Sequence, residues 1–187
     1  MINVLIILLN YFVTLAQMEE TLLKSKFADF ADKNVREKWG VTNDDVMGGV
    51  SSSKISTGEN DALVFSGNVS LENNGGFASL RSPVDDYDMS AYEGFLIKVK
   101  GDGKNYYLSF RQTKYFTGFN FTQRFQTEKD KWQTIKLHFN DFKLKYYGRE
   151  VTDSELPDKS SIKQLSILIS DKQQGPFKIE IAWIGLY

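Results

Sequence analysis

Short runs of alternating apolar and polar residues, separated by turn residues, dominate the chain from Ser51 to its C-terminus. In the last run, every second residue from position 177 to position 183 is apolar, with Lys178 and Glu180 between them. Successive side chains of a strand point to opposite faces of its sheet, so this period of two indicates a strand with one buried face. Three other runs each place an apolar triplet on one face: Phe95, Ile97 and Val99; Ile135, Leu137 and Phe139; Leu165, Ile167 and Ile169.

These patterns predict strands that alternate with Gly-, Asn- and Ser-rich turns. The predicted strands cover residues 50–55, 62–66, 68–71, 77–82, 95–100, 106–111, 119–126, 133–139, 164–170 and 177–184. Many short strands with few helical patterns favour an all-β fold, namely an antiparallel β-sandwich or jelly roll. The chain has 187 residues and no linker or repeat, so a single domain is expected.

The N-terminal residues predict a leader peptide. Residues 1–17 are mostly apolar and uncharged, but the apolar run is shorter than the roughly 20 residues that span a bilayer. Small residues at Thr14 and Ala16 favour a signal peptide at residues 1–16, cleaved after Ala16, followed by one domain at 17–187. The protein is then expected to be exported, periplasmic or secreted, without a stable membrane span. The alternative is an uncleaved N-terminal anchor that leaves the protein membrane-associated.

The segment after the leader leaves two interpretations open. Leu23, Phe27 and Phe30 are spaced to share one face of a helix. The same phenylalanines also suit a first strand.

Composition argues against several classes of function. The net charge is −1, so a nucleic-acid partner has no electrostatic support. The absence of cysteine excludes disulfides, thiol nucleophiles and Cys-ligated zinc. The single histidine, His138, alternates with apolar neighbours and is expected on the outer face of a strand. One imidazole cannot build a histidine-based metal cluster, and no Gly-x-Ser-x-Gly elbow accompanies it.

Residues 39–51 are the most distinctive segment, with a tryptophan, three Asx residues and a glycine pair in one turn-rich connection. Glycine reaches positive φ without a Cβ clash, so Gly48 and Gly49 allow a tight turn. Asp44 and Asp45 are expected to pin that turn by hydrogen bonds to the backbone. The segment is therefore interpreted as a structural corner that includes Trp39, Asp45, Met47, Gly48, Gly49 and Ser51.

The residues at positions 44–51, Asp-Asp-Val-Met-Gly-Gly-Val-Ser, resemble the opening signature of the complex I intermediate-associated protein 30 family. Further matches follow in order at residues 76–82, 92–95, 98–106, 132, 139–142 and 175–184, so the resemblance spans roughly residues 27–187. It implies a β-sandwich related in fold to galactose-binding domains. Mitochondrial members of this family help to assemble respiratory complex I, which implies a non-enzymatic domain that binds a protein partner as an assembly factor or chaperone. The leader, which contains no arginine, argues against carrying over a mitochondrial location.

Catalytic and metal chemistry have little support. Paired carboxylates at Asp44/Asp45, Asp85/Asp86/Asp88 or Asp153/Glu155 suit glycoside hydrolysis only if two of them face a cleft, and all three groups fall in turns. Loop carboxylates also suit calcium, but no EF-hand spacing is present. The glycines at Gly101 and Gly103 read as a hairpin turn, so no nucleotide or other cofactor is expected.

The aromatic and polar run at residues 106–125 is the best binding candidate. If alternate residues face the core, Tyr107 and Arg111 point outward, and Tyr115 lies in the following loop. Together with Trp132, and tentatively Asp44 and Asp45, they are the candidate binding residues. Tyrosine and arginine are frequent anchors of protein interfaces. The alternative is a carbohydrate-binding module, in which Tyr107, Arg111, Tyr115 and Trp132 gather on one concave face.

Overall fold

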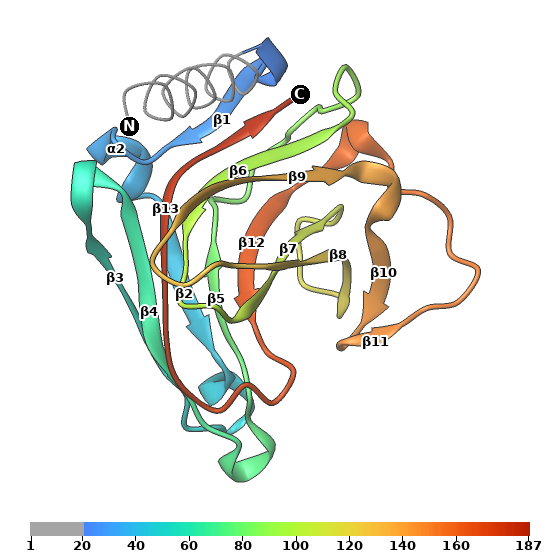
Figure 1. Ribbon diagram of the computed structural model, residues 1–187. Helices are drawn as coiled ribbons and strands as arrows, with labels where there is room; N and C mark the ends of the chain where they lie inside the picture. Colours follow the sequence, from blue (N-terminus) through green and yellow to red (C-terminus); the bar gives the residue numbers. More distant parts are fainter. Residues whose placement is uncertain (1–20) are drawn as a thin grey trace, which may run out of the picture.

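The computed structural model describes residues 21–187, and the expected leader at residues 1–16 lies outside them. Two antiparallel sheets pack face to face (Figure 1), which confirms the all-β sandwich. One sheet has the order β3 (Ser52–Thr57), β4 (Leu63–Val69), β13 (Gly175–Leu186), β6 (Gly94–Lys100), β9 (Trp132–His138), with β1 (Ser25–Asp29) paired to β13. The other has the order β11 (Arg149–Glu150), β10 (Lys143–Tyr146), β8 (Phe119–Gln126), β7 (Asn105–Arg111), β12 (Gln164–Ile169), β5 (Ala78–Arg81), β2 (Gly40–Asn43).

Apart from Thr21 and Leu22, which are helical, helical structure among the described residues is limited to short turns. The α-helix is α2 (Lys33–Arg36), and the 3-10 helices are η1 (Asp44–Met47), η2 (Glu59–Asp61), η3 (Glu72–Asn74), η4 (Phe139–Asp141) and η5 (Lys159–Ser161). Asp32 caps α2 by accepting a hydrogen bond from the backbone N–H of Asn34. The first strand, β1, decides the open interpretation of Phe27 in favour of a strand.

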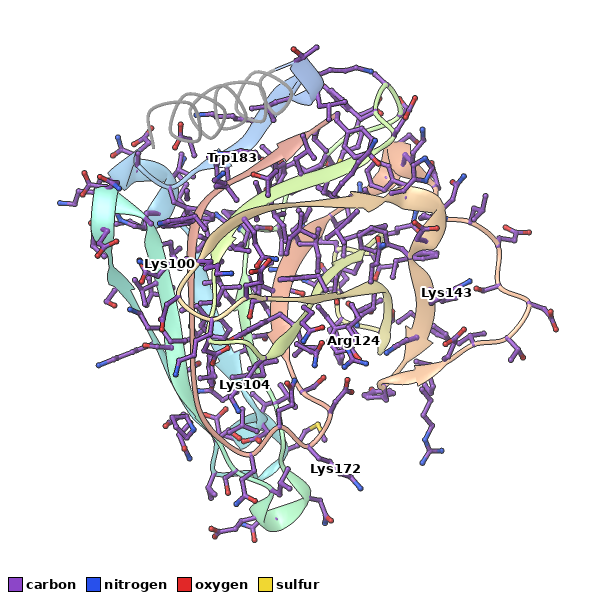
Figure 2. All side chains as sticks on the ribbon, viewed as in Figure 1. Lys100, Lys104, Arg124, Lys143, Lys172 and Trp183 are labelled. Atoms are coloured by element: carbon purple, nitrogen blue, oxygen red, sulfur yellow. The ribbon has the colours of Figure 1, made fainter. Side chains whose placement is uncertain are left out.

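The core lies between the sheets and is built from the apolar face of each strand. The triplets of β6 and β12, Phe95, Ile97 and Val99 with Leu165, Ile167 and Ile169, are all fully buried. Phe95 lies 5.0 Å from Phe139 and 5.9 Å from Phe142 between ring centroids. Phe110, from the opposite sheet, lies 4.9 Å from Phe142 and 5.5 Å from Phe121. These rings join the two sheets in one aromatic cluster, and Figure 2 shows side chains filling the space between them.

A bulge in β13 changes which residues the last strand buries. Its pairing with β6 skips one residue between Ile181 and Trp183. The extra residue, Ala182, accepts a hydrogen bond from the backbone N–H of Phe30 instead. A bulge reverses the alternation beyond it, so Ile184 is buried and Trp183 is only half-buried. The expectation that Trp183 shares the inner face of Ile179 and Ile181 is therefore wrong.

The strand boundaries differ from the predicted ones at Gly67. The expected strands at 62–66 and 68–71 are one continuous strand, β4. A Cβ atom at Gly67 would lie 2.0 Å from the carbonyl oxygen of Ser52 on β3, so a close approach of two backbones requires glycine there. Gly67 therefore indicates close contact between β4 and β3, and it does not form a turn.

Replacing Phe95 with alanine is expected to lower the free energy of unfolding by about 3–5 kcal/mol, because the change leaves a cavity in the aromatic cluster. Phe116→Ala, which removes an exposed ring, serves as the matched control and is expected to change stability by about 0.5 kcal/mol or less. Urea denaturation of both variants measures the difference. A loss below about 1 kcal/mol in Phe95→Ala would contradict the assigned role of the cluster.

Candidate functional site

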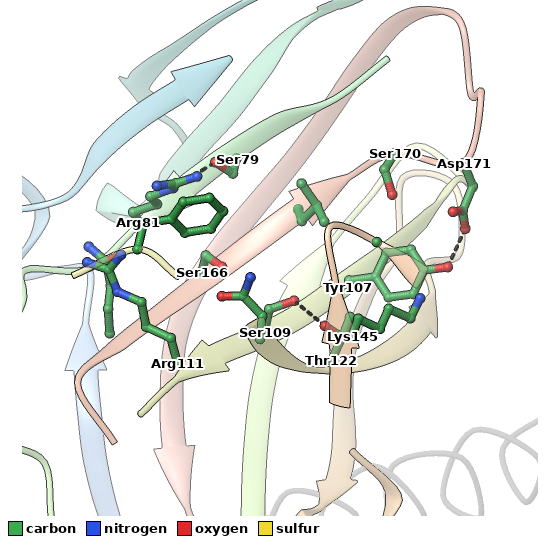
Figure 3. A pocket seen from close by; sticks show the side chains of 15 residues that line it. Ser79, Arg81, Tyr107, Ser109, Arg111, Thr122, Lys145, Ser166, Ser170 and Asp171 are labelled. Atoms are coloured by element: carbon green, nitrogen blue, oxygen red, sulfur yellow. Dashed lines mark hydrogen bonds between the residues drawn. The ribbon is translucent and has the colours of Figure 1, made fainter. Parts of the chain in front are cut away.

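The outer face of the seven-stranded sheet carries a hollow of about 250 Å³ (Figure 3). The alternation of β7 builds its centre: Tyr106, Leu108 and Phe110 are buried in the core, whereas Tyr107, Ser109 and Arg111 line the hollow. Hydroxyl side chains from neighbouring strands lie between its two charged ends. These hydroxyl side chains are Ser79, Ser109, Thr122, Ser166 and Ser170.

Two arginines form one end of the hollow. Arg81 from β5 and Arg111 from β7 are half-buried and near enough that the charge of one acts on the other. Burial and the neighbouring Arg111 charge both lower the pKa of Arg81, and burial lowers that of Arg111. Neither forms an ion pair with any residue of the described chain. Two partly desolvated positive charges therefore share this end without a counter-charge.

The Nε atom of Arg81 has a hydrogen-bond partner, whereas the Nε atom of Arg111 has none among the described residues. The Arg81 Nε donates to the hydroxyl of Ser79 at 3.0 Å, and that hydroxyl donates to the backbone carbonyl of Thr42 at 3.1 Å. The Ser79 proton thus points away from the arginine, leaving a lone pair for it. The Arg111 Nε, by contrast, is buried without a partner in the described chain. An unpaired buried donor costs about 1–3 kcal/mol, a cost that a bound acceptor would remove.

The opposite end is closed by internal contacts. The Tyr107 hydroxyl donates to the carboxylate of Asp171, and the Lys145 ammonium lies 4.6 Å from the centre of the tyrosine ring. Burial, this hydrogen bond and the Asp171 charge raise the pKa of Tyr107 to about 12. Because Lys145 covers its ring, Tyr107 is held as part of the wall.

An aromatic rim borders the hollow. It consists of Phe116 and Phe119 from the β7–β8 region and Tyr146 and Tyr147 from the end of β10. Ring centroids are 4.6 Å apart for Phe119 and Tyr146, 4.7 Å for Tyr146 and Tyr147, and 5.8 Å for Phe116 and Tyr147. Exposed fractions run from 44% for Phe119 to 60% for Tyr147. Phe116 also lines the hollow, so the rim and the polar cavity form one continuous surface.

The candidate binding residues do not all meet. Tyr107 and Arg111 share the hollow, whereas Tyr115 is 76% exposed in the loop beyond it. Trp132 begins β9 on the other sheet, where the Lys100 ammonium lies 5.4 Å from its ring centre. That lysine also pairs with Glu59 and with the buried Glu180. The structure therefore separates Trp132 from the other three residues.

Sequence reasoning missed Arg81, Tyr146 and Tyr147 as site residues, whereas Phe116 and Phe119 fell within the predicted run at residues 106–125. Arg81 stood outside the aromatic run and enters the hollow only because β12 lies between β5 and β7. The tyrosine pair ends a strand, β10, that was not predicted. Adjacent tyrosines before a glycine, at positions 146–148, were the available signal.

The corner at residues 39–51 depends on one buried carboxylate. Asp44 is fully buried, and its oxygens accept hydrogen bonds from the hydroxyl and backbone N–H of Ser51 and from the backbone N–H groups of Gly76 and Phe77. Three chain segments thereby meet at one side chain. Burial raises the pKa of Asp44, but the four hydrogen bonds together lower it below the ordinary value. These internal bonds occupy both oxygens, which leaves Asp44 no exposed surface for a ligand.

The rest of the corner is shaped around that carboxylate. A Cβ atom at Gly49 would lie 2.4 Å from the Asp44 side chain, and Gly48 has a φ of +88°, so both positions favour glycine. Asp45 is exposed, and among the described residues its side chain accepts only the backbone N–H of Val46, at 3.0 Å. The loop holds Met47 in solvent. Trp39 lies at the other end of β2, buried against Phe30 at 5.1 Å between ring centroids.

Among the other carboxylate groups, Asp153 and Glu155 line a second hollow of about 490 Å³, together with Asp158 and Arg111. Asp86 pairs with Lys163, and Asp88 accepts hydrogen bonds from Ser90. Among residues 21–187, no group of three or more histidine, cysteine, aspartate or glutamate side chains is arranged to hold a metal ion. The described residues thus add no support for the calcium alternative, and of the three carboxylate groups only Asp153/Glu155 meets the condition that two carboxylates line a hollow.

A family model described as Complex I intermediate-associated protein 30 matches residues 28–181. The chain belongs to this family. The matched residues include both the corner at residues 39–51 and the residues that line the hollow.

Curated relatives agree with the family. The chain is 29% identical over 186 residues to the mitochondrial complex I intermediate-associated protein 30 of Mus musculus, covering 84% of this chain and 54% of the relative. The Drosophila melanogaster protein of the same name is 25% identical, covering 84% and 61%. A probable Caenorhabditis briggsae member is 30% identical, covering 74% and 46%. The chain thus spans about half the length of the relatives it matches.

Solved structures show the same fold. The family 11 carbohydrate-binding module of a Clostridium thermocellum cellulase superposes with a TM-score of 0.65 at 16% identity, covering 88% of this chain and 94% of the module. The agarase AgWH50C superposes with a TM-score of 0.56 at 10% identity, covering 86% of this chain and 26% of the enzyme. At such identities the likeness concerns the fold alone.

The names of the relatives contradict the expectation of an exported protein, because those from mouse, fruit fly and nematode are all named as mitochondrial. That expectation rested on hydrophobicity and small residues near Ala16, which do not distinguish one targeting route from another. Within residues 21–187, no helix is long and apolar enough to cross a membrane.

Asp44→Asn is expected to lower the free energy of unfolding at pH 7 by about 2–3 kcal/mol, because an amide cannot accept hydrogen bonds at both ends. The folded pKa of Asp44 lies below its ordinary value, so this stabilisation is complete above about pH 4 and lost as the pH falls through the folded pKa. The stability gap between wild type and variant should therefore narrow below pH 4 in urea denaturation. Asp45→Asn is the control, and equal losses in both variants would contradict the role of Asp44.

Proposed function

We propose that this chain is a non-catalytic domain that binds a protein partner during the assembly of respiratory complex I. Its family and the names of its relatives support the assembly role. The observation that carries the protein-binding part is the aromatic rim of Phe116, Phe119, Tyr146 and Tyr147.

Four exposed rings in mutual contact are unusual on a surface that meets only water. Aromatic side chains bury large areas on binding and lose little conformational entropy, so clustered tyrosines and phenylalanines are typical of interface hot spots. The rings of the rim already pack on one another, which fixes their orientation before a partner arrives. Polar groups of the hollow beside them supply the hydrogen-bonding part of an interface.

The arrangement of polar side chains also favours binding over catalysis. The hollow offers serine hydroxyls, but the chain's one histidine, His138, lies on β9 of the other sheet, where its Nδ1 accepts the backbone N–H of Asn140. No histidine therefore lies beside those hydroxyls to activate one as a nucleophile, and the carboxylate in the hollow, Asp171, already accepts a hydrogen bond from the Tyr107 hydroxyl.

Replacing Phe119 or Tyr146 with alanine is expected to weaken partner binding by about 1–2 kcal/mol each, or roughly 5- to 30-fold in Kd. The tagged wild-type chain is purified from host cells in mild detergent, and the complex I subunits enriched with it are quantified by mass spectrometry. The Kd of the wild type and of each variant is then measured with the most enriched subunit. Val84→Ala, which truncates an exposed apolar side chain between β5 and β6, is the matched control. Wild-type protein that enriches no complex I subunit would refute the proposal.

A second candidate function is glycan binding in the hollow. Its line of hydroxyl and amide side chains suits a polyhydroxylated ligand, and one solved structure of the fold is titled as a complex with a mixed-linked β-1,3-1,4 tetrasaccharide. This function predicts that mixed-linkage β-glucan retards the chain in affinity gel electrophoresis and that Asn120→Ala reduces the retardation. Unchanged mobility of the wild type would count against it.

A further inference from the structure

We propose that Arg81 and Arg111 together bind a carboxylate carried by an acidic segment of the protein partner. This inference rests on the protein-binding function proposed above and names the chemistry of the partner. It depends on three features of the hollow: an uncompensated charge, a vacant hydrogen-bond donor and continuity with the aromatic rim.

The charge at this end of the hollow calls for an anion. Figure 3 shows the Arg81 and Arg111 side chains on the same side of the hollow, away from Asp171. Asp171 is engaged with Tyr107 at the opposite end, and no other acidic side chain among residues 21–187 lines the hollow. Two guanidinium groups that are half removed from water attract a negative group far more strongly than surface lysines do.

The hydrogen-bonding pattern favours a planar carboxylate. Arg81 is oriented by Ser79 through its Nε, which leaves its terminal nitrogens free to donate. The Arg111 Nε is buried and has no acceptor among the described residues. A carboxylate accepts two parallel N–H donors from an arginine fork, so one such group satisfies the vacant Nε and offsets one of the two positive charges at the same time.

The surroundings favour a peptide as the carrier of that carboxylate. A hollow of about 250 Å³ corresponds to the volume of roughly eight water molecules, enough for one acidic side chain and a short piece of its backbone. Serine and threonine hydroxyls along the hollow can pair with peptide N–H and C=O groups. Because Phe116 belongs to both the hollow and the rim, a segment that packs on the rings passes directly over the arginines.

Binding of the carboxylate itself is tested first, by NMR of the arginine Nε–H groups in the full chain. The probes are N-acetyl-glutamate amide, its neutral analogue N-acetyl-glutamine amide, and inorganic phosphate. We expect the glutamate probe to shift the Arg111 Nε–H signal saturably at millimolar concentration and the glutamine probe to leave it unchanged. Equal shifts with both amides, no shift at all, or tighter binding of phosphate than of the glutamate probe would overturn the proposal. Arg111→Lys assigns the signal.

The partner is tested with the complex I subunit that the wild-type chain enriches most. Arg111→Gln is expected to weaken its binding by about tenfold or more, because a charge-assisted pair is lost. Arg111→Lys keeps the charge but lacks the fork, so it should also bind more weakly than wild type. Lys54→Gln, which removes one exposed charge from β3 on the other sheet, is the matched control and should bind like wild type.

The outcomes separate this inference from the proposed function. If wild-type chain captures complex I subunits and both Arg111 variants bind them as tightly, the carboxylate site is refuted and the protein-binding function stands. If wild-type chain captures none, the proposed function itself fails. Since the Arg111 Nε makes no internal hydrogen bond and its burial works against stability, its variants should unfold at the wild-type urea concentration or at a higher one. An Arg111→Gln variant that unfolds earlier would reveal a structural role and overturn the assignment.

Discussion

The alternation of β7 between the core and the outer face is the constraint on which the rest of this structure depends. Tyr106, Leu108 and Phe110 are buried between the two sheets. Because successive side chains of a strand point to opposite faces, Tyr107, Ser109 and Arg111 face outward. Neighbouring strands in register on both sides, β8 and β12, extend that outer row into a polar surface. Packing in the core therefore also fixes the positions of the polar side chains in the hollow. Such preorganised groups lose less conformational entropy when a ligand binds.

The inner faces of the two sheets stabilise the fold, whereas the outer face of the seven-stranded sheet carries the proposed binding site. Stability comes from the aromatic cluster around Phe95 and Phe110, and from Asp44, whose carboxylate ties the two ends of the corner to the segment at Gly76 and Phe77. The outer face instead keeps features that work against stability, namely two adjacent positive charges and the unpaired Nε of Arg111. Groups that weaken the free molecule and are satisfied only by a ligand are typical of binding sites.

The Asp44 corner marks the family, although its chemistry is structural. Its acidic, glycine-rich sequence suggests an exposed loop, yet the first carboxylate is buried under four hydrogen bonds, and glycine is needed at position 49 because that carboxylate lies against it. Asp45 and the apolar side chains of Val46, Met47 and Val50 are the exposed side chains of this corner. The proposed binding surface lies elsewhere, on β7, β8 and β10, in sequence that carries no comparable signature.

The sequence by itself determined the all-β class, most strand positions, the family and the outward direction of Tyr107 and Arg111, because period-two alternation is a local property of each strand. Only the tertiary structure decided that Trp183 leaves the inner face at a bulge, that Trp132 lies on the opposite sheet from Tyr107, and that Arg81 joins Arg111. Each of these depends on which strands become neighbours. Strand order is set by packing between residues far apart in the chain, and a local pattern carries no record of it.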